Sequence, residues 1–262
     1  MSATVHKAAD EPTGRRSGED IVPEIRVTVA SGQPATTELI AALTAACAEI
    51  ETSGAQVALV LRIVGAPAHL ADSPSWSNIR SVNRWERLLR RIERLGVPVL
   101  AVADGVCTGP AAEALLVADH RVVAADFVFQ LDGDDAAAWP SMAIHRLGQQ
   151  LGVAAARPMV LFRTAVHARE AVAVGLVDEV AEDLAAAERA VLDGWYKSAL
   201  TDVGIRRALL LESAWVSPEV ALGAHLAACD RTLRRAAGDD PAGSPSRPVP
   251  RRAADPESIS PQ

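Results

Sequence analysis

Apolar runs and helix-like repeats alternate along the first two thirds of the chain. Residues 25–29 have the pattern of a strand, and continuous apolar runs, which are typical of buried strands, cover residues 57–64 (with one arginine inside it) and 97–103. Residues 38–50 and 85–95 instead repeat their apolar side chains every three or four positions, which predicts amphipathic helices. Because strands that alternate with helices usually pair in parallel, the pattern predicts an α/β fold with a parallel sheet.

The pattern after residue 180 is helical throughout. Ser217 followed by Pro218 is typical of a helix start, where serine caps the first turn and proline takes the first helical position. Apolar side chains then repeat along one face of this helix: Leu222, Leu226, Cys229 and Leu233. This face would suit packing within the chain and packing against another subunit equally well.

The two ends of the chain lack both patterns. They are rich in proline, glycine, serine and charged side chains, a composition typical of disordered segments. We therefore predict four parts: a disordered N-terminal segment over 1–23, an α/β core over 24–182, a helical region over 183–237 and a disordered tail over 238–262.

Composition narrows the class of protein. The 262 residues, 49% of them hydrophobic, are enough for one large core, and the aromatic share of 3% predicts that alanine, leucine and valine fill it. The net charge of −7 argues against a nucleic-acid partner or an anionic membrane surface, although a local basic patch can still bind a polyanion. The sequence has no long uncharged apolar run and no signal-peptide core, so we expect a cytoplasmic protein without a transmembrane helix.

The cysteines and histidines show no ligand pattern. Cys47, Cys107 and Cys229 are far apart and odd in number, so we expect them to be buried small hydrophobic residues in a reducing compartment. No pair of histidines has the spacing of a metal site, and we expect no metal. The chain also lacks a nucleophile elbow, a P-loop and a dinucleotide fingerprint.

The segment 97–119 carries the clearest chemical signal. Its apolar run ends at an aspartate and Gly105, a second glycine follows at Gly109, and a helix of small residues then bears one carboxylate, Glu113. A strand that turns tightly into a helix presents free N–H groups and the positive end of the helix dipole, which together bind anions. Glu113 would then lie beside a bound oxyanion, or else be a helix N-terminal carboxylate that the dipole stabilises.

This segment resembles the signature of the crotonase superfamily, the enoyl-CoA hydratases and isomerases, PVIAAVNGxALGGGxELALACD. The positions that match are Pro98, Ala101, Gly105, Gly109, Glu113 and Asp119. A second stretch of the family, LTGxxxxAxEAxxxGLVxxV, is similar to residues 161–180 here. The resemblance covers most of residues 24–235 and implies a spiral of ββα turns followed by C-terminal helices. It also implies a homotrimer or a dimer of trimers.

The resemblance implies chemistry on an acyl-CoA thioester. Members of the superfamily hold the thioester oxygen with two backbone N–H groups, and each such donor is worth roughly 3 kcal/mol in the transition state. Hydratases add two glutamates that position and activate water. Glu113 matches the first glutamate, and the positions that would hold the substrate are Ala66, Gly109 and Ala111. No cofactor other than the CoA of the substrate is implied.

The chain departs from the family at the second glutamate. Gly133 stands where that glutamate belongs. The neighbouring Asp132 and Asp134 either assist Glu113 with a shorter carboxylate or form a solvated acidic loop.

Both N–H donors of the family also differ here. Pro110 stands where a glycine donates its N–H, and proline has none, so either Gly109 or Ala111 supplies this donor or the donor is lost. The segment that carries the other donor is shortened, and Ala66 is the nearest candidate within it.

These departures are similar to those of a divergent branch of the superfamily, the DpgB-type proteins of dihydroxyphenylglycine biosynthesis in glycopeptide-antibiotic pathways. The similar stretches include AWPSMA at 138–143 and RLGQQ at 146–150. The branch implies a type III polyketide synthase as partner and the dehydration and aromatisation of its polyketide thioester toward 3,5-dihydroxyphenylacetyl-CoA. Two alternatives stay open: a non-catalytic accessory that stimulates the synthase, and a thioesterase or isomerase on the same fold.

Overall fold

The computed structural model describes residues 5–7, 23–53, 57–65, 78–131, 140–198 and 202–237. Contacts within the chain divide it into two units, residues 1–221 and 222–262, and each is described by itself. Most of the two segments predicted to be disordered lies outside the described residues. No helix in the described ranges is long and apolar enough to cross a membrane.

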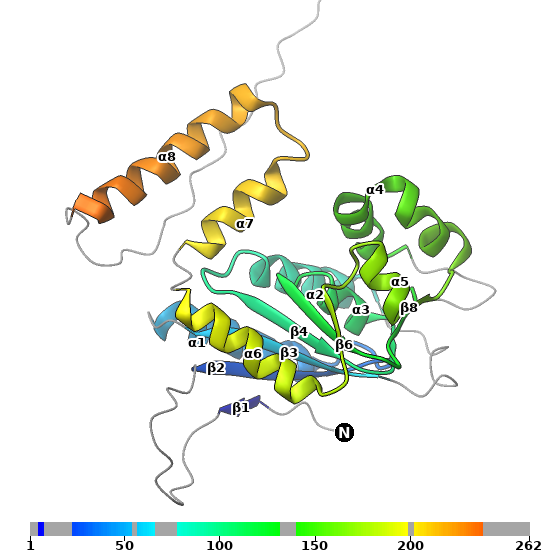
Figure 1. Ribbon diagram of the computed structural model, residues 1–262. Helices are drawn as coiled ribbons and strands as arrows, with labels where there is room; N and C mark the ends of the chain where they lie inside the picture. The colour runs from blue at the N-terminus through cyan, green and yellow to red at the C-terminus, as the bar shows by residue number, and fades with distance from the viewer. Residues whose placement is uncertain are drawn as a thin grey trace, which may run out of the picture. The chain divides into compact units, whose positions relative to one another are not determined.

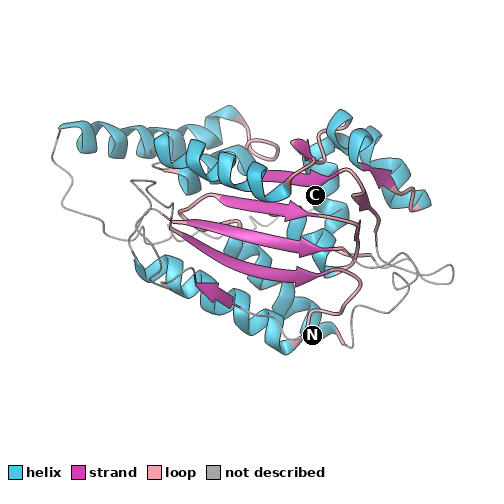
Figure 2. Cartoon of the chain, turned by 60° about the horizontal axis from the view of Figure 1, so that its bottom comes forward, coloured by secondary structure: helices cyan, strands magenta, loops and turns pink. Residues whose placement is uncertain are grey.

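A six-stranded sheet forms the centre of the first unit (Figure 1). Its strands lie in the order β1 (Val5–Lys7), β2 (Glu24–Ala30), β3 (Ala58–Val64), β4 (Val99–Ala103), β6 (His120–Ala124) and β9 (Glu179–Ala181). The five strands from β2 to β9 pair in parallel, and β1 is antiparallel to β2. Figure 2 shows the long strands pointing one way and the short β1 pointing the other. The predicted α/β fold with a parallel sheet is confirmed.

A smaller sheet continues two strands of the large one. It consists of β5 (Val106–Cys107), β7 (Val128–Phe129) and β8 (Val166–His167), in the order β5-β7-β8. Strand β4 leads into β5 and then into helix α3 (Pro110–Leu115), while β6 leads into β7 and then into α4 (Ala143–Phe162). These two strand–strand–helix turns are the ββα units that the family resemblance implies.

Both faces of the large sheet are buried, which explains the continuous apolar runs. Leu59, Leu61 and Ile63 of β3 join the main core cluster, whereas Ala58 and Val60 join a second cluster on the opposite face. The main cluster includes residues of α1 (Thr37–Ser53), α2 (Ile79–Ile92), α3, α4 and α5 (Ala168–Ala173). The second cluster includes residues of α6 (Leu184–Lys197).

The arginine that interrupts the apolar run of β3 has a specific partner. The Arg62 guanidinium lies 2.6 Å from the Asp104 carboxylate at the end of β4. The same carboxylate accepts a hydrogen bond of 2.9 Å from the Gly65 N–H. Arg62 therefore helps to join the C-terminal ends of two neighbouring strands, which is where the α3 turn begins.

Two further helices follow the α/β part. Helix α7 (Val203–Glu212) belongs to the first unit. Helix α8 (Pro218–Ala237) begins at the proline that the sequence indicated, and its residues 222–237 are the described part of the second unit. Cys47 and Cys107 are buried, as predicted, but Cys229 on α8 is exposed, so that prediction was wrong. Helical periodicity marks a common face without determining which surface covers it.

Candidate functional site

The turn between β4 and α3 depends on two glycines. Gly105 and Gly109 have φ angles of 55° and 59°, a left-handed region that glycine adopts without steric cost. The ends of β3 and β4 also approach closely here, since a Cβ on Gly65 would lie 2.3 Å from the Asp104 carbonyl oxygen. The turn predicted at Gly105 is therefore built from close backbone packing that larger residues would prevent.

The turn is fixed from the side by buried polar residues. The Thr108 N–H donates a 2.9 Å hydrogen bond to the Ser31 hydroxyl oxygen, and both residues are buried. Gly109 then caps α3 without a side-chain hydrogen bond, and Pro110 takes the first helical position. No described residue accepts a hydrogen bond from the N–H of Gly109 or Ala111. Both are buried at the start of α3, which leaves two N–H groups for a ligand oxygen.

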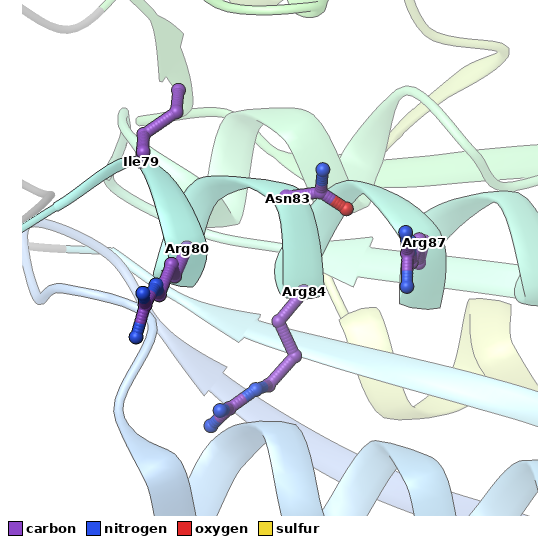
Figure 3. Close-up of a pocket in the computed structure, with 5 residues that line it drawn as sticks. All are labelled: Ile79, Arg80, Asn83, Arg84 and Arg87. Atoms are coloured by element: carbon purple, nitrogen blue, oxygen red, sulfur yellow. The ribbon is translucent and has the colours of Figure 1, made fainter.

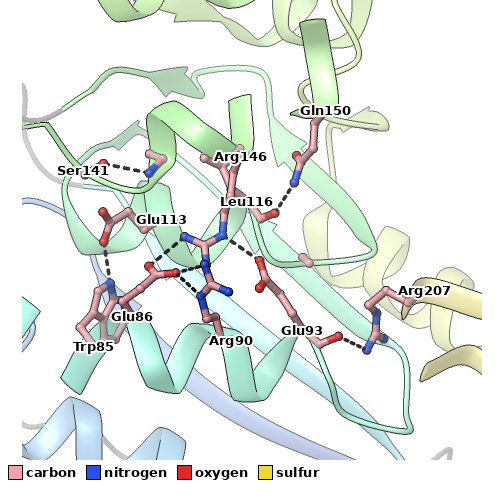
Figure 4. A network of polar contacts seen from close by, with 12 residues as sticks. Trp85, Glu86, Arg90, Glu93, Glu113, Leu116, Ser141, Arg146, Gln150 and Arg207 are labelled. Atoms are coloured by element: carbon pink, nitrogen blue, oxygen red, sulfur yellow. Dashed lines mark hydrogen bonds and ion pairs between the residues drawn. The ribbon is translucent and has the colours of Figure 1, made fainter. Parts of the chain in front are cut away.

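Glu113 is a buried carboxylate on this helix. Only 5% of the residue is exposed, and the indole N–H of Trp85 donates a 2.6 Å hydrogen bond to its Oε2 (Figure 4). Burial raises the pKa of Glu113 from 4.5 to about 7, although hydrogen bonds from Ser141 and Trp85 and the charge of Arg146 act in the opposite direction. Glu113 is thus poised to gain and lose a proton near neutral pH.

Trp85 reaches Glu113 from the buried face of α2. The helix begins after Asn78, whose side chain accepts a 3.0 Å hydrogen bond from the Ser81 N–H. Trp85 is the first residue of the apolar stripe that the periodicity predicted, and it is 1% exposed. The periodicity predicts a core residue at this position and no contact with Glu113. Because a buried indole N–H requires an acceptor, the tryptophan was itself the signal of a polar partner.

An ion-pair network joins α2 to the start of α4 beside Glu113. The Arg146 guanidinium on α4 contacts Glu86 on α2 and Glu93 at the C-terminal cap of α2, with a shortest distance of 2.7 Å to each carboxylate (Figure 4). The Arg146 side chain is only 5% exposed, and the two carboxylates accept its hydrogen bonds and compensate its buried charge. Ser141 precedes α4, and its hydroxyl oxygen accepts a 3.0 Å hydrogen bond from the Ala143 N–H. The network therefore fixes the segment that brings Ser141 to Glu113.

A hollow of about 370 Å³ lies against the outer face of α2 and is rich in guanidinium groups. It is lined by Ile79, Arg80, Asn83, Arg84 and Arg87. Figure 3 shows Arg80 and Arg84 extending to one side of the helix and Ile79 and Asn83 to the other. Within the described part of the chain none of the three arginines has an ion-pair partner. Their positive charge is therefore available to a phosphate or carboxylate.

Asp119, which matches the end of the family signature, has a structural role. Its carboxylate accepts a 2.8 Å hydrogen bond from the Val99 N–H and forms an ion pair with Arg207 of α7. Arg207 also donates to the carbonyl oxygens of Leu95 and Val97, each at 2.8 Å. These contacts hold α7 against the loop before β4.

Three predicted site residues, Ala66, Asp132 and Asp134, lie outside the described residues. The structure does place Glu113, Gly109 and Ala111 together on one turn and one short helix. Across the described ranges, no three His, Cys, Asp or Glu side chains converge as a metal site would require.

Comparisons with protein families and with known sequences point to the same family. The profile of the enoyl-CoA hydratase/isomerase family matches residues 77–205. A protein of Amycolatopsis orientalis described as an enoyl-CoA-hydratase is 38% identical over 213 residues, which cover 78% of this chain and 92% of that protein.

Solved structures share the fold. An enoyl-CoA hydratase from Shewanella pealeana has a TM-score of 0.69 at 15% identity, covering 89% of this chain and 88% of that one. An enoyl-CoA hydratase/isomerase from Cupriavidus metallidurans has a TM-score of 0.68 at 19% identity, covering 80% and 84%. At such identities these similarities establish the arrangement of the backbone and nothing about the reaction.

Proposed function

Because the chain belongs to the enoyl-CoA hydratase/isomerase family, we propose that it is a lyase that removes water from an acyl-CoA thioester, with Glu113 as acid and base. The substrate we propose is the cyclised polyketide thioester of a type III polyketide synthase, dehydrated and aromatised toward 3,5-dihydroxyphenylacetyl-CoA. The observation that supports this role is the buried Glu113 carboxylate at the start of α3, whose pKa lies near neutrality.

The reaction needs one group that takes a proton and returns it. The Glu113 carboxylate takes a proton from the carbon next to the thioester carbonyl, and the electron pair moves onto the thioester oxygen as an enolate. When the carbonyl re-forms, the double bond appears and the hydroxyl leaves the neighbouring carbon with the proton that Glu113 returns. The products are water and an unsaturated thioester, and Glu113 ends as it began, ionised.

The enolate oxygen needs N–H donors. We assign this role to Gly109 or Ala111 at the start of α3, because Pro110 between them has no N–H. Ala66 is the proposed second donor. The preceding residue, Gly65, packs against Gly105, so the chain leaves β3 beside the turn that leads into α3. We further propose that Asp132 or Asp134 assists Glu113.

The nucleotide part of an acyl-CoA carries several phosphate charges. The hollow along α2 offers Arg80, Arg84 and Arg87 without ion-pair partners among the described residues, and guanidinium groups match phosphate geometry well. We propose that the CoA phosphates bind there, on the helix whose opposite face carries Trp85.

We propose a cytoplasmic homotrimer or dimer of trimers. Support comes from apolar side chains exposed on α4, where Val153, Leu161 and Phe162 are 65–74% accessible. Light scattering measures the mass directly. A monomer at micromolar concentration would contradict the assembly and leave the proposed reaction unaffected.

One observation favours a second function, a non-catalytic accessory that stimulates the synthase. Pro110 removes a donor at the place where the family presents an N–H, so the chain can retain the fold without its full oxyanion hole.

A paired assay separates the two functions. The synthase is incubated with malonyl-CoA alone, with this protein, and with Glu113→Gln, and the dihydroxyphenylacetate-type products are quantified. Catalysis predicts stimulation that is lost with Glu113→Gln and kept with Glu179→Gln, a matched change at an exposed residue of β9. Stimulation that survives Glu113→Gln would support the accessory function. If no form stimulates the synthase, the polyketide substrate is wrong.

A further inference from the structure

Glu113 and Trp85 face each other across the interface between α3 and α2. The indole Nε1 lies 2.6 Å from Glu113 Oε2, and the two residues are 1% and 5% exposed. Both helices are anchored in the main core, and 28 positions separate the two residues in the sequence. The contact therefore depends on tertiary packing of rigid elements.

We propose that Trp85 is the positioning residue for Glu113: its indole N–H holds one carboxylate oxygen and fixes the direction in which the carboxylate meets the thioester. This inference rests on the proposed function, because it assigns to Glu113 the proton transfer described there. Trp85 acts on the reaction through Glu113 and takes no part in the bond changes.

The geometry around the pair limits what else can hold the carboxylate. Ser141 donates from the segment before α4, and that segment is itself held by Arg146, which contacts Glu86 of α2 and Glu93 at the end of α2. The charged groups that act on Glu113 are Arg146 from α4 and Glu86 from α2. Of the two uncharged donors, Trp85 comes from a regular helix with a capped N-terminus, and Ser141 comes from a loop.

Hydrogen bonding to Oε2 also has an electrostatic consequence. A donor near a carboxylate stabilises the ionised form and lowers its pKa, against the effect of burial. The proposed reaction begins with ionised Glu113. Removing the indole N–H therefore raises the pH at which Glu113 becomes active, by about one pH unit for a buried charged hydrogen bond.

The first test is the pH profile of Trp85→Phe, with hydration of crotonyl-CoA as the reaction followed. We expect kcat/KM to be about fivefold lower near pH 7, to recover at about pH 9, and its acid limb to shift upward by about one unit. Trp195→Phe makes the same chemical change in the second cluster, and we expect an unshifted limb. A loss that is equal at every pH would mean a purely structural role and would overturn the proposal.

The second test uses the unaltered chain and no substrate. With ¹⁵N-labelled indole groups, the five tryptophans give five N–H resonances. We expect one resonance to shift with pH, with a midpoint near the pKa of Glu113. This shift should be absent in Glu113→Gln and unchanged in Glu179→Gln. If no indole resonance titrates in this way, Trp85 does not hold Glu113. A wild-type chain that does not hydrate crotonyl-CoA would show that this thioester is not a substrate, and the synthase assay tests the proposed reaction itself; this titration would still decide the contact in either case.

Discussion

Arg207 and Asp119 form a bidentate ion pair although 88 positions separate them in the chain. The same guanidinium donates to carbonyl oxygens of the loop before β4, and its side chain is 7% exposed. The pair closes α7 onto the α/β core of the first unit, next to the strand that leads to the site.

We expect Arg207→Met to lower the free energy of unfolding by about 3 kcal/mol, because it leaves the Asp119 charge and the loop carbonyls without their partner. Urea unfolding of Arg207→Met, Asp119→Asn and the double variant measures the coupling between the two residues. A coupling close to zero would show that the pair behaves like an exposed ion pair.

Stability depends on pH through Glu113. Its pKa is raised to about 7 in the folded chain, so between its unfolded and folded pKa values the folded state binds more protons than the unfolded state. The free energy of unfolding therefore falls as pH rises over this window. The stabilising contribution of Glu113 protonation is complete only below the pKa of the unfolded chain. Relative to Glu113→Gln, we expect wild type to lose up to about 3 kcal/mol between about pH 4 and about pH 8.

Thermal unfolding of both proteins across this range measures the difference, with Glu179→Gln as the matched control. A wild-type curve that runs parallel to that of Glu113→Gln would contradict the raised pKa.

Replacing different glycines by alanine should lower the free energy of unfolding by different amounts. Gly65→Ala places a Cβ 2.3 Å from the Asp104 carbonyl oxygen and must move backbone, so it should destabilise most. Gly105→Ala combines a positive φ with a 3.2 Å contact, and Gly175→Ala has a positive φ alone, which costs about 1 kcal/mol. Gly96→Ala meets no atom and serves as control. The losses in the free energy of unfolding, measured by chemical denaturation, should follow this order. Equal losses for all four variants would refute the close approach of β3 and β4.

Neutralising the hollow on α2 should weaken CoA binding without changing the chemistry. We expect Arg84→Gln and Arg87→Gln each to raise the KM for an acyl-CoA by roughly tenfold with kcat little changed, since each loses a charged contact to phosphate. The effect should shrink as salt is added. Arg189→Gln, an exposed change on α6, is the control. An unchanged KM in both variants would place the CoA phosphates elsewhere.

The sheet could be predicted from the sequence because its physical cause is local. Strands buried on both faces must be apolar at nearly every position, and β3 and β4 show this directly, whereas β2 alternates between buried apolar and partly buried residues. Strand β4 begins two residues later than the apolar run, and the Pro98 carbonyl before it accepts a 3.0 Å hydrogen bond from the Leu59 N–H. Helix α2 extends six residues before Trp85, because Asn78 caps it and the residues of its first turn are not buried, so they add nothing to the apolar stripe.

The surroundings of Glu113 could not be predicted in the same way. Periodicity placed Trp85 on a buried face, but the partner of its N–H depends on how α2 meets α3. Arg146 is charged and yet buried, and its charge is compensated by Glu86 on α2 and Glu93 at the end of α2. Such contacts join positions far apart in the sequence, and a single sequence contains no signal that pairs them.

An indole in contact with an ionisable carboxylate is also an optical probe. The emission of a tryptophan responds to the charge next to its ring, so the fluorescence of Trp85 should change as Glu113 gains or loses its proton or as a thioester displaces its surroundings. The protein thus carries an internal reporter of the state of its own site, which allows ligand binding to be followed by light without a label.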